Sequence, residues 1–199
     1  MNKAAIAVLV SGGGTNLQAL IDAQNSGIIK SGEIKLVVSS CADAFALKRA
    51  EKAGIKCSVC ERGKLTKAEF ENAILKSLYE NEIDIIVLAG FMCILSEDFV
   101  RRFPQRIINV HPSLIPSFCG KGFYSLKVHE AALAYGVKVT GATVHFVNEI
   151  PDGGRIIMQK AVEINENDTP ETLQKRVMEN AEWKILPLSV EKVCKEIIK

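Results

Sequence analysis

An asparagine and a histidine that could take part in acyl-group chemistry lie two residues apart in the stretch IINVHPSLIP, residues 107–116. Residues 107–110 read as a short buried strand, in which an asparagine is uncommon. Asn109 and His111 would point to the same face if the strand persists as far as the histidine. The amide could then stabilise an oxyanion, and the imidazole could donate or accept a proton. A lone histidine is more often structural, so a catalytic role for His111 would be better supported by a carboxylate that pairs with it.

Two residues far along the chain could be partners of His111. Asp152, in the triplet Asp-Gly-Gly of residues 152–154, is a candidate carboxylate, although Asp-Gly is also a common turn pair. His145 is expected either as a core histidine or as support for the reacting groups. His129, the third histidine, lies on a helical pattern over residues 125–135 and is expected at the surface.

Three glycines follow the first predicted strand, in the stretch SGGGTN of residues 11–16. Glycines let backbone N–H groups approach an anion closely, and the N-terminus of the following helix favours negative charge. The dinucleotide pattern G-x-G-x-x-G fails because its last position is Leu17, and the Gly-Lys-Ser/Thr of a Walker loop is missing. The stretch therefore predicts either a cradle for a single phosphate or a turn that only links strand to helix.

The elements that must position these residues alternate regularly in the first half of the chain. Apolar runs typical of buried strands are followed by helical patterns, one of which opens with a capping box, Thr66 with Glu69. Such alternation predicts a mostly parallel sheet with helices on both faces, and ligands bind beyond the carboxyl ends of such strands. The expected strands are residues 4–10, 34–39, 56–60, 83–88 and 107–110. The expected helices include one with Leu17, Leu20 and Ile21 on one face, and residues 42–53, 66–80 and 97–103.

The pattern changes from residue 142 onward. Residues 142–147 and 155–164 read as two strands joined like a long hairpin. Thr169 and Pro170 have the order of a cap residue and a first-turn proline, and Pro187 is expected to interrupt the helix that they start. The expected fold class is α/β, an open, mostly parallel, Rossmann-like sheet with antiparallel strands added near the C-terminal part. The whole chain, 1–199, is expected to form one domain.

Composition narrows the class of protein. The 199 residues are 48% hydrophobic and 24% charged, and the formal charge of +2 gives no reason to expect a nucleic-acid partner. No apolar run approaches the length of a membrane span, so no membrane partner is expected. Six scattered cysteines suit a reducing cytoplasm, and Cys57 and Cys60 are expected as buried strand residues more than as a metal or redox pair.

Five stretches together strongly resemble a known family: SGGGTNL, DIIVLAGFMCIL, INVHPSLIPSF, TGATVHFV and DGG. They are similar to the glycinamide ribonucleotide formyltransferases, a folate-dependent family of purine synthesis, and the resemblance spans residue 6 to about residue 187. The Asn-x-His-Pro-Ser-Leu-x-Pro stretch is specific to folate-dependent formyltransferases. The resemblance implies one formyltransferase domain, with a phosphate-binding half, 1–103, and a catalytic and folate-binding half, 104–199.

The resemblance also implies substrates and site residues. The formyl group of 10-formyltetrahydrofolate would pass directly to the amine of glycinamide ribonucleotide, without a metal or a covalent intermediate. Asn109 and a protonated His111 would stabilise the oxyanion, and Asp152 would favour the imidazolium. By the same resemblance, the ribonucleotide would be bound by Gly14, Thr15, Asn16 and Glu182, and the folate by Lys67, Met92, Cys93, Ile94, Leu95, Asn109, Asn148, Glu149, Ile150, Pro151 and Asp152.

Some positions depart from the family. Lys67 and Cys93 stand where the family often has arginine, and Trp183 stands where it often has histidine. The segment 120–125 is longer than its counterpart in familiar members, so its contacts cannot be inferred. The oligomeric state is not indicated by the sequence.

Three rival functions remain open. A methionyl-tRNA formyltransferase is expected to have a further nucleic-acid-binding domain after the catalytic one. A formyltetrahydrofolate hydrolase is expected to have a regulatory domain before it. A phosphate-binding module without catalysis would have no need for Asn109, His111 and Asp152 together.

Overall fold

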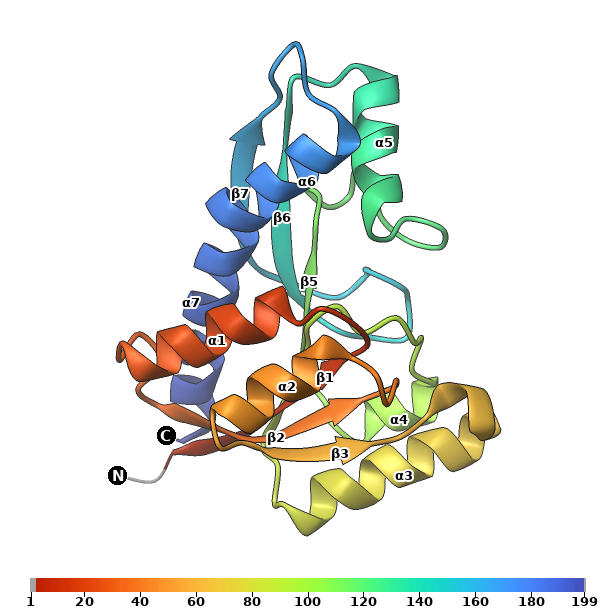
Figure 1. Cartoon of the computed structure of the whole chain (residues 1–199), viewed down its shortest axis with the longest axis vertical. Coiled ribbons are helices and arrows are strands. Elements are labelled where there is room, and N and C mark those ends of the chain that lie inside the picture. The colour runs from red at the N-terminus through yellow and green to blue at the C-terminus, as the bar shows by residue number, and fades with distance from the viewer. Residues whose placement is uncertain (1–2, 199) are drawn as a thin grey trace.

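The computed structural model describes residues 3–198, in which seven strands form one sheet in the order β3-β2-β1-β4-β5-β6-β7 (Figure 1). Neighbouring strands from β3 to β5 are parallel, whereas β5 pairs with β6, and β6 with β7, antiparallel. The strands are β1 Ala4–Val10, β2 Gly32–Ser39, β3 Lys56–Val59, β4 Ile85–Leu88, β5 Ile107–His111, β6 Val139–Phe146 and β7 Ile156–Glu163.

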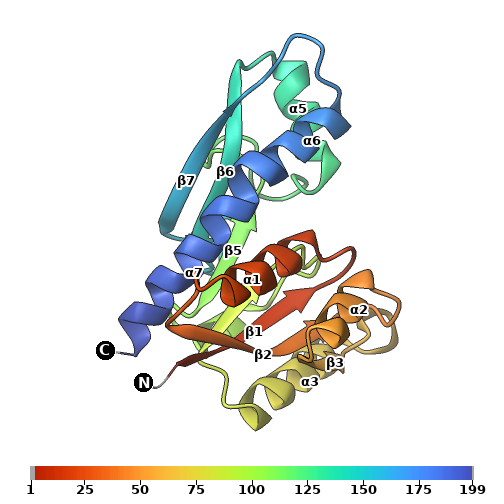
Figure 2. The ribbon, with the colours of Figure 1, turned by 60° about the vertical axis from the view of Figure 1, so that its left-hand side comes forward.

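Helices cover both faces of this sheet because its central strands are apolar on both sides. In β1, Ile6 and Val8 belong to a core that includes residues of α1, α2, α6 and α7, whereas Ala7 and Leu9 belong to a core with α3 and α4 (Figure 2). The helices are α1 Thr15–Asn25, α2 Phe45–Lys52, α3 Lys67–Glu80, α4 Glu97–Arg101, α5 Leu126–Tyr135, α6 Pro170–Val177 and α7 Trp183–Ile197.

The predicted α/β class, with its mostly parallel sheet and antiparallel addition, is confirmed. The capping box of Thr66 and Glu69 is present, and Thr169 caps α6 with Pro170 in its first turn. Strand β5 continues to His111, one residue beyond the predicted end, which places Asn109 and His111 on one face.

The predicted break at Pro187 is wrong. Pro187 lies inside α7, in the second turn of a helix that begins at Trp183. Pro187 has no N–H to donate to the carbonyl of Trp183, four residues earlier, yet the helix continues to Ile197. The irregularity lies earlier, in a π-helical segment, Met178–Glu182, between α6 and α7. The pattern of the sequence alone did not indicate it.

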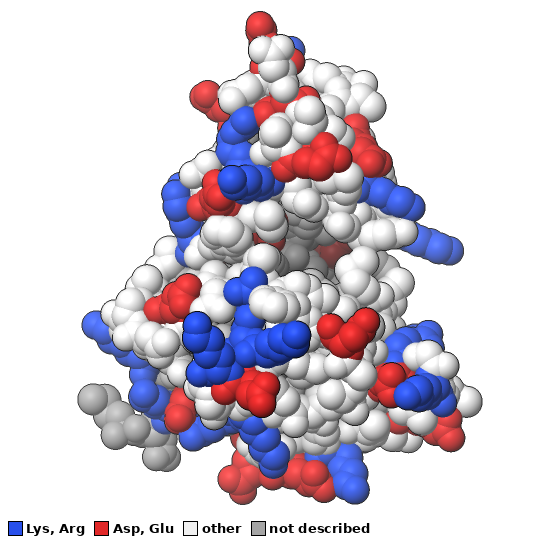
Figure 3. All heavy atoms as spheres, viewed as in Figure 1, with Lys and Arg blue, Asp and Glu red and all other residues white. Residues whose placement is uncertain are grey.

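Within residues 3–198, no helix is both long enough and apolar enough to cross a membrane. Figure 3 shows that the face seen in Figure 1 is hollowed at its centre, between the part carrying α1 and α2 and the part carrying α5 and α6.

Candidate active site

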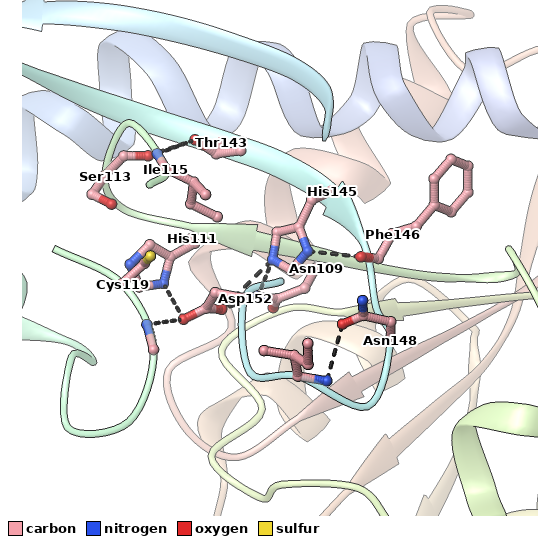
Figure 4. A network of polar contacts seen from close by, with 12 residues as sticks. Asn109, His111, Ser113, Ile115, Cys119, Thr143, His145, Phe146, Asn148 and Asp152 are labelled. Carbon is pink, nitrogen blue, oxygen red and sulfur yellow. Dashed lines mark hydrogen bonds and ion pairs between the residues drawn. The ribbon is translucent and has the colours of Figure 1, made fainter. Parts of the chain in front are cut away.

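Asn109, His111 and Asp152 lie together where β5 ends (Figure 4). The pairing of β5 with β6 sets Asn109 opposite His145, and both histidine rings are buried, with 4% of His111 and 1% of His145 exposed. Asp152 comes from the loop between β6 and β7, where a backbone φ of 57° turns the chain back toward β5. The structure thus brings the three predicted catalytic residues and His145 into one cluster, in which the histidines are buried and Asn109 and Asp152 are half-buried.

The loop after β5 contacts His111 and Asp152. One ring nitrogen of His111, Nε2, lies 2.9 Å from the carbonyl oxygen of Phe118, and the other, Nδ1, lies 3.5 Å from Asp152 Oδ2. The N–H of Gly120 donates to the same carboxylate oxygen at 2.8 Å. A carbonyl oxygen can only accept, so Nε2 of His111 carries a proton.

Burial lowers the pKa of His111 below its ordinary value, and nearby His145 acts in the same direction. The Asp152 carboxylate and the Phe118 carbonyl act oppositely but do not outweigh burial. Burial alone would raise the pKa of Asp152, but contacts with His145, His111 and the Gly120 N–H lower it overall, so the carboxylate stays ionised. The two ring nitrogens of His111 face two acceptors, the Phe118 carbonyl and the ionised Asp152 carboxylate, which favour the imidazolium, whereas burial favours the neutral ring. The protonated His111 expected from the sequence stays a prediction.

His145 orients the amide of Asn109. Its Nδ1 lies 2.8 Å from the carbonyl oxygen of Phe146, so Nδ1 carries a proton, and its Nε2 lies 3.6 Å from Asp152 Oδ1. Asn109 Nδ2 lies 3.2 Å from the same Nε2 and 3.5 Å from Asp152 Oδ1. These two contacts hold the Asn109 side chain between His145 and Asp152.

The glycine loop and the C-terminal helices meet at a second cluster. Asn16 Nδ2 donates to Glu182 Oε2 at 2.7 Å, although the two residues are 166 positions apart, and Thr15 contacts the sulfur of Met178. Burial raises the pKa of Glu182, and the Asn16 bond only partly opposes this. Asn16 Oδ1 is buried without a hydrogen-bond partner among residues 3–198. Gly14 begins α1 with φ 71°.

The two predicted folate loops expose apolar side chains. In the loop after β4, Met92 is 56% and Ile94 68% exposed, and Ile150 in the loop after β6 is 60% exposed. The N–H of Met92 donates to Ser11 Oγ at 2.9 Å, which ties the first of these loops to the glycine loop. The side chain of Asn148 accepts from the N–H of Ile150 at 3.0 Å and so holds the turn.

The remaining predicted folate residues flank these loops. Cys93 and Leu95 are half-buried beside the core of α3 and α4, and Glu149 and Pro151 are exposed. Lys67, at the start of α3, lies 3.9 Å from the Glu71 carboxylate. Glu71 in turn accepts from the N–H of Ser96, the residue after the first folate loop, at 2.7 Å.

His129 is not the surface residue that the helical pattern suggested. It is fully buried in α5, and neither ring nitrogen has a hydrogen-bond partner among the described residues. Burial lowers the pKa of His129 to about 4, and the neighbouring His111 contributes to this. The surface position expected for His129 is therefore wrong, because packing against other segments buries this face of α5.

The prediction that Cys57 and Cys60 are both buried strand residues is only half right. Cys60 is buried as predicted, but Cys57 is exposed, because β3 is the edge strand of the sheet. Within the described part of the chain, no three His, Cys, Asp or Glu side chains are grouped as metal ligands would be.

Comparison with known proteins identifies the family. The sequence model of the formyl transferase family matches residues 4–190. The chain belongs to the formyl transferase family. The family's relatives include phosphoribosylglycinamide formyltransferase of Haemophilus influenzae, 43% identical over 93% of this chain and 84% of the relative.

Another relative and a solved structure match over nearly the whole chain. The trifunctional purine biosynthetic protein adenosine-3 of Homo sapiens is 47% identical over 96% of this chain. The chain spans only 18% of that relative's length. The crystal structure of glycinamide ribonucleotide transformylase 1 from Symbiobacterium toebii superposes with a TM-score of 0.91 at 37% identity, over 98% of this chain and 89% of that one.

Proposed function

We propose that this formyl transferase transfers the formyl group of 10-formyltetrahydrofolate to the amine of 5-phosphoribosylglycinamide, in purine synthesis. The observation that carries the proposal is the cluster of Asn109, His111 and Asp152 at the same edge of the sheet as the glycine loop. The names of the similar proteins support the choice of acceptor. The six free thiols support a cytoplasmic location.

In this proposal, Asn109 stabilises the oxyanion. The substrate amine attacks the formyl carbon, and negative charge develops on the formyl oxygen. The Asn109 Nδ2–H that His145 does not take is available to donate to that oxygen. His145 acts by holding the amide in the orientation that presents this donor.

His111 is proposed to carry the proton. Transfer requires one proton to leave the attacking amine and one to reach the folate nitrogen that departs. A neutral His111 can accept the first proton, and the imidazolium can deliver a proton to the leaving nitrogen. The ionised Asp152, 3.5 Å from Nδ1, stabilises the imidazolium while it exists.

We place the two substrates on different loops. The phosphate lies at Gly14, Thr15 and Asn16, where free N–H groups begin α1. Asn16 Oδ1 and the Glu182 carboxylate are acceptors, which suits the hydroxyl groups of a ribose. The pterin ring lies between the exposed apolar side chains of the loops after β4 and β6.

A turnover assay tests the proposal. The purified chain is incubated with 10-formyltetrahydrofolate and 5-phosphoribosylglycinamide, and formylated product is measured by mass spectrometry. We expect product only when both substrates are present. Loss of formyl-folate without an acceptor would indicate a hydrolase, formylation of methionyl-tRNA would indicate the tRNA enzyme, and either result without ribonucleotide turnover contradicts the proposal.

A further inference from the structure

The glycine loop of residues 11–14 is held from one side by α2. The N–H of Ala46 donates to the carbonyl oxygen of Gly12 at 3.0 Å, and Arg49 Nε donates to the carbonyl oxygen of Gly13 at 2.8 Å. Gly14 lies so close to α2 that a Cβ added there would stand 2.6 Å from the Cβ of Ala46. The carbonyl groups of Gly12 and Gly13 therefore point toward α2.

The direction of these carbonyls fixes the direction of the loop amides. In a planar trans peptide unit, the C=O of one residue and the N–H of the next point in opposite directions. The bond from Ala46 thus turns the N–H of Gly13 away from α2, and the bond from Arg49 does the same for Gly14. Thr15 and Asn16 contact Met178 and Glu182 of the C-terminal segments, and Figures 1 and 2 both place those segments and α2 on different sides of α1.

Arg49 is itself held in a defined orientation. Its guanidinium group donates to Gln18 Oε1 at 3.1 Å, and its central carbon lies 5.0 Å from the centroid of the Phe45 ring. Neighbouring Lys48 also lies over that ring, at 5.8 Å, but no hydrogen bond joins Lys48 to the glycine loop among the bonds of residues 3–198. Contacts with Gly13, Gln18 and Phe45 therefore orient Arg49. Of the two basic residues over the Phe45 ring, Arg49 is the one that is hydrogen-bonded to the glycine loop.

We infer that Arg49 is a positioning residue for the phosphate of the acceptor substrate. It acts through the backbone: by holding the Gly13 carbonyl, it keeps the Gly14 N–H directed at the phosphate. Its charge also offsets the partial negative charge of that carbonyl. This inference rests on the proposed function, because it assigns the phosphate to the glycine loop.

The conformational freedom of glycine is the reason such a residue is needed. The peptide unit between Gly13 and Gly14 carries no side chain that would prevent it from turning over. After such a turn, a carbonyl oxygen would face the phosphate where an N–H had been, and it would repel the anion. Arg49 prevents this turn, because its hydrogen bond to the Gly13 carbonyl forms only when the Gly14 N–H faces the phosphate.

Kinetics of Arg49→Met test the inference. Since a hydrogen bond to a charged group is lost, we expect the KM for 5-phosphoribosylglycinamide to rise about 10- to 100-fold. The value of kcat and the affinity for a folate analogue should stay within about twofold of wild type, because the reacting groups and the pterin loops are elsewhere. Lys48→Met is the matched control, and its KM should stay within about twofold of wild type.

Arg49→Lys separates the effect of the guanidinium hydrogen bonds from the effect of the positive charge. It also tests the inference if Arg49→Met does not fold. Lysine keeps the charge but lacks the planar group that bonds Gly13 and Gln18 together. We expect only partial rescue, with KM about 3- to 10-fold above wild type. A wild-type KM in either folded Arg49 variant overturns the inference, and so does an equal rise in Lys48→Met.

A binding measurement separates this inference from the proposed function. Inorganic phosphate and ribose 5-phosphate are titrated into ¹⁵N-labelled protein while the backbone amide signals of Gly13 and Gly14 are followed. We expect these signals to shift in wild type and in Lys48→Met, and to need about tenfold more phosphate in Arg49→Met. If wild type binds phosphate there but does not formylate the ribonucleotide, the proposed function fails and the role of Arg49 stands. Equal phosphate affinity in all three proteins overturns the role of Arg49.

Discussion

At the residue scale, the chemistry depends on which nitrogen of each histidine carries a proton. Backbone carbonyls settle this, because Phe118 and Phe146 each accept from one ring nitrogen. Nδ1 of His111 then faces Asp152, and Nε2 of His145 faces Asn109. Under the proposed function, the two rings have different roles: His111 transfers protons and His145 orients Asn109.

Substitution of the proton carrier should lower turnover much more than stability. His111→Asn keeps a donor for the Phe118 carbonyl but cannot transfer protons, so we expect kcat to fall about 10²- to 10⁴-fold. Asn109→Ala should lower kcat about 10²- to 10³-fold, since one oxyanion donor is lost. Steady-state assays on variants with near wild-type melting temperatures measure both effects. Cys119→Ser, on the adjacent loop, is the control and should retain activity; an active His111→Asn would remove the histidine from the mechanism.

Replacement of Asp152 by asparagine should lower the pKa of His111 further, because a neutral amide no longer favours the imidazolium. Asparagine suits the test because it tolerates the φ of 57° at this position. NMR titration of the His111 ring in both proteins measures the change. The acid limb of the pH–rate profile, which reports protonation of the resting ring, should move to lower pH in the variant. An unchanged or higher pKa would contradict this role of Asp152.

Buried His129 should make the protein less stable in acid. Its pKa of about 4 in the folded state lies below the ordinary value of about 6.5, so the unfolded state binds the extra proton between these pH values. The free energy of unfolding should therefore decrease as pH falls from about 6.5 to about 4, by at most about 3 kcal/mol from this residue. Denaturant unfolding of wild type and His129→Leu across that range isolates the effect. Parallel pH profiles for the two proteins would exclude it.

At the element scale, the strand-and-helix alternation could be predicted because each element carries its own period. The alternating cores of β1 and the capping box of α3 follow from neighbouring residues alone. The face that α5 buries could not be predicted in this way, since Val128 and His129 are both fully buried by contacts with other segments. The π-helical segment before α7 was missed for the same reason.

The glycine loop supports a prediction that distinguishes two of its glycines. Gly13 has open space where a Cβ would be, whereas Gly14 has φ 71° and lies against Ala46. Gly13→Val should therefore fold near normally yet weaken ribonucleotide binding, since the side chain blocks the approach to the loop amides. Gly14→Val should also lower the melting temperature, because the backbone is strained and α2 must move.

Calorimetric titration of each ligand and thermal unfolding measure these two effects. Folate-analogue affinity is the internal control and should be unchanged in Gly13→Val. If ribonucleotide affinity survives in a folded Gly13→Val protein, the loop only connects β1 to α1. If Gly14→Val unfolds at the wild-type temperature, the close contact of Gly14 with α2 does not limit the side chain at this position.

At the scale of the whole molecule, the two expected halves, 1–103 and 104–199, share a hydrophobic core. Helix α7, from the end of the chain, shares a core with α1, and Glu191 accepts the N–H groups of Lys30 and Ser31 at 2.8 and 2.9 Å. The phosphate-binding half, 1–103, thus depends on the last helix for its core. The division of the chain into halves remains a proposal about function.

A fragment of residues 1–103 should consequently not fold alone. Without α7, it would expose Leu20 and Ile21 of α1 and leave the backbone before β2 without its carboxylate partner. The full chain should unfold in one cooperative transition by circular dichroism and denaturant titration, and the fragment should show none. Addition of residues 104–199 as a second fragment is the positive control for recovery of structure. A cooperative transition in the fragment alone would show two independent domains.

The sequence by itself determined the order of strands and helices, the glycine loop, and the placement of Asn109 and His111 on one face of a strand. Periodicity and turn chemistry are local, so one chain segment is enough to specify them. Only the tertiary structure decided which segments meet: Asp152 beside His111, Glu182 beside Asn16, and Arg49 beside Gly13. It also decided that His129 is buried and that burial lowers the pKa of His111. These outcomes depend on crossovers, packing and desolvation, which are properties of distant segments together.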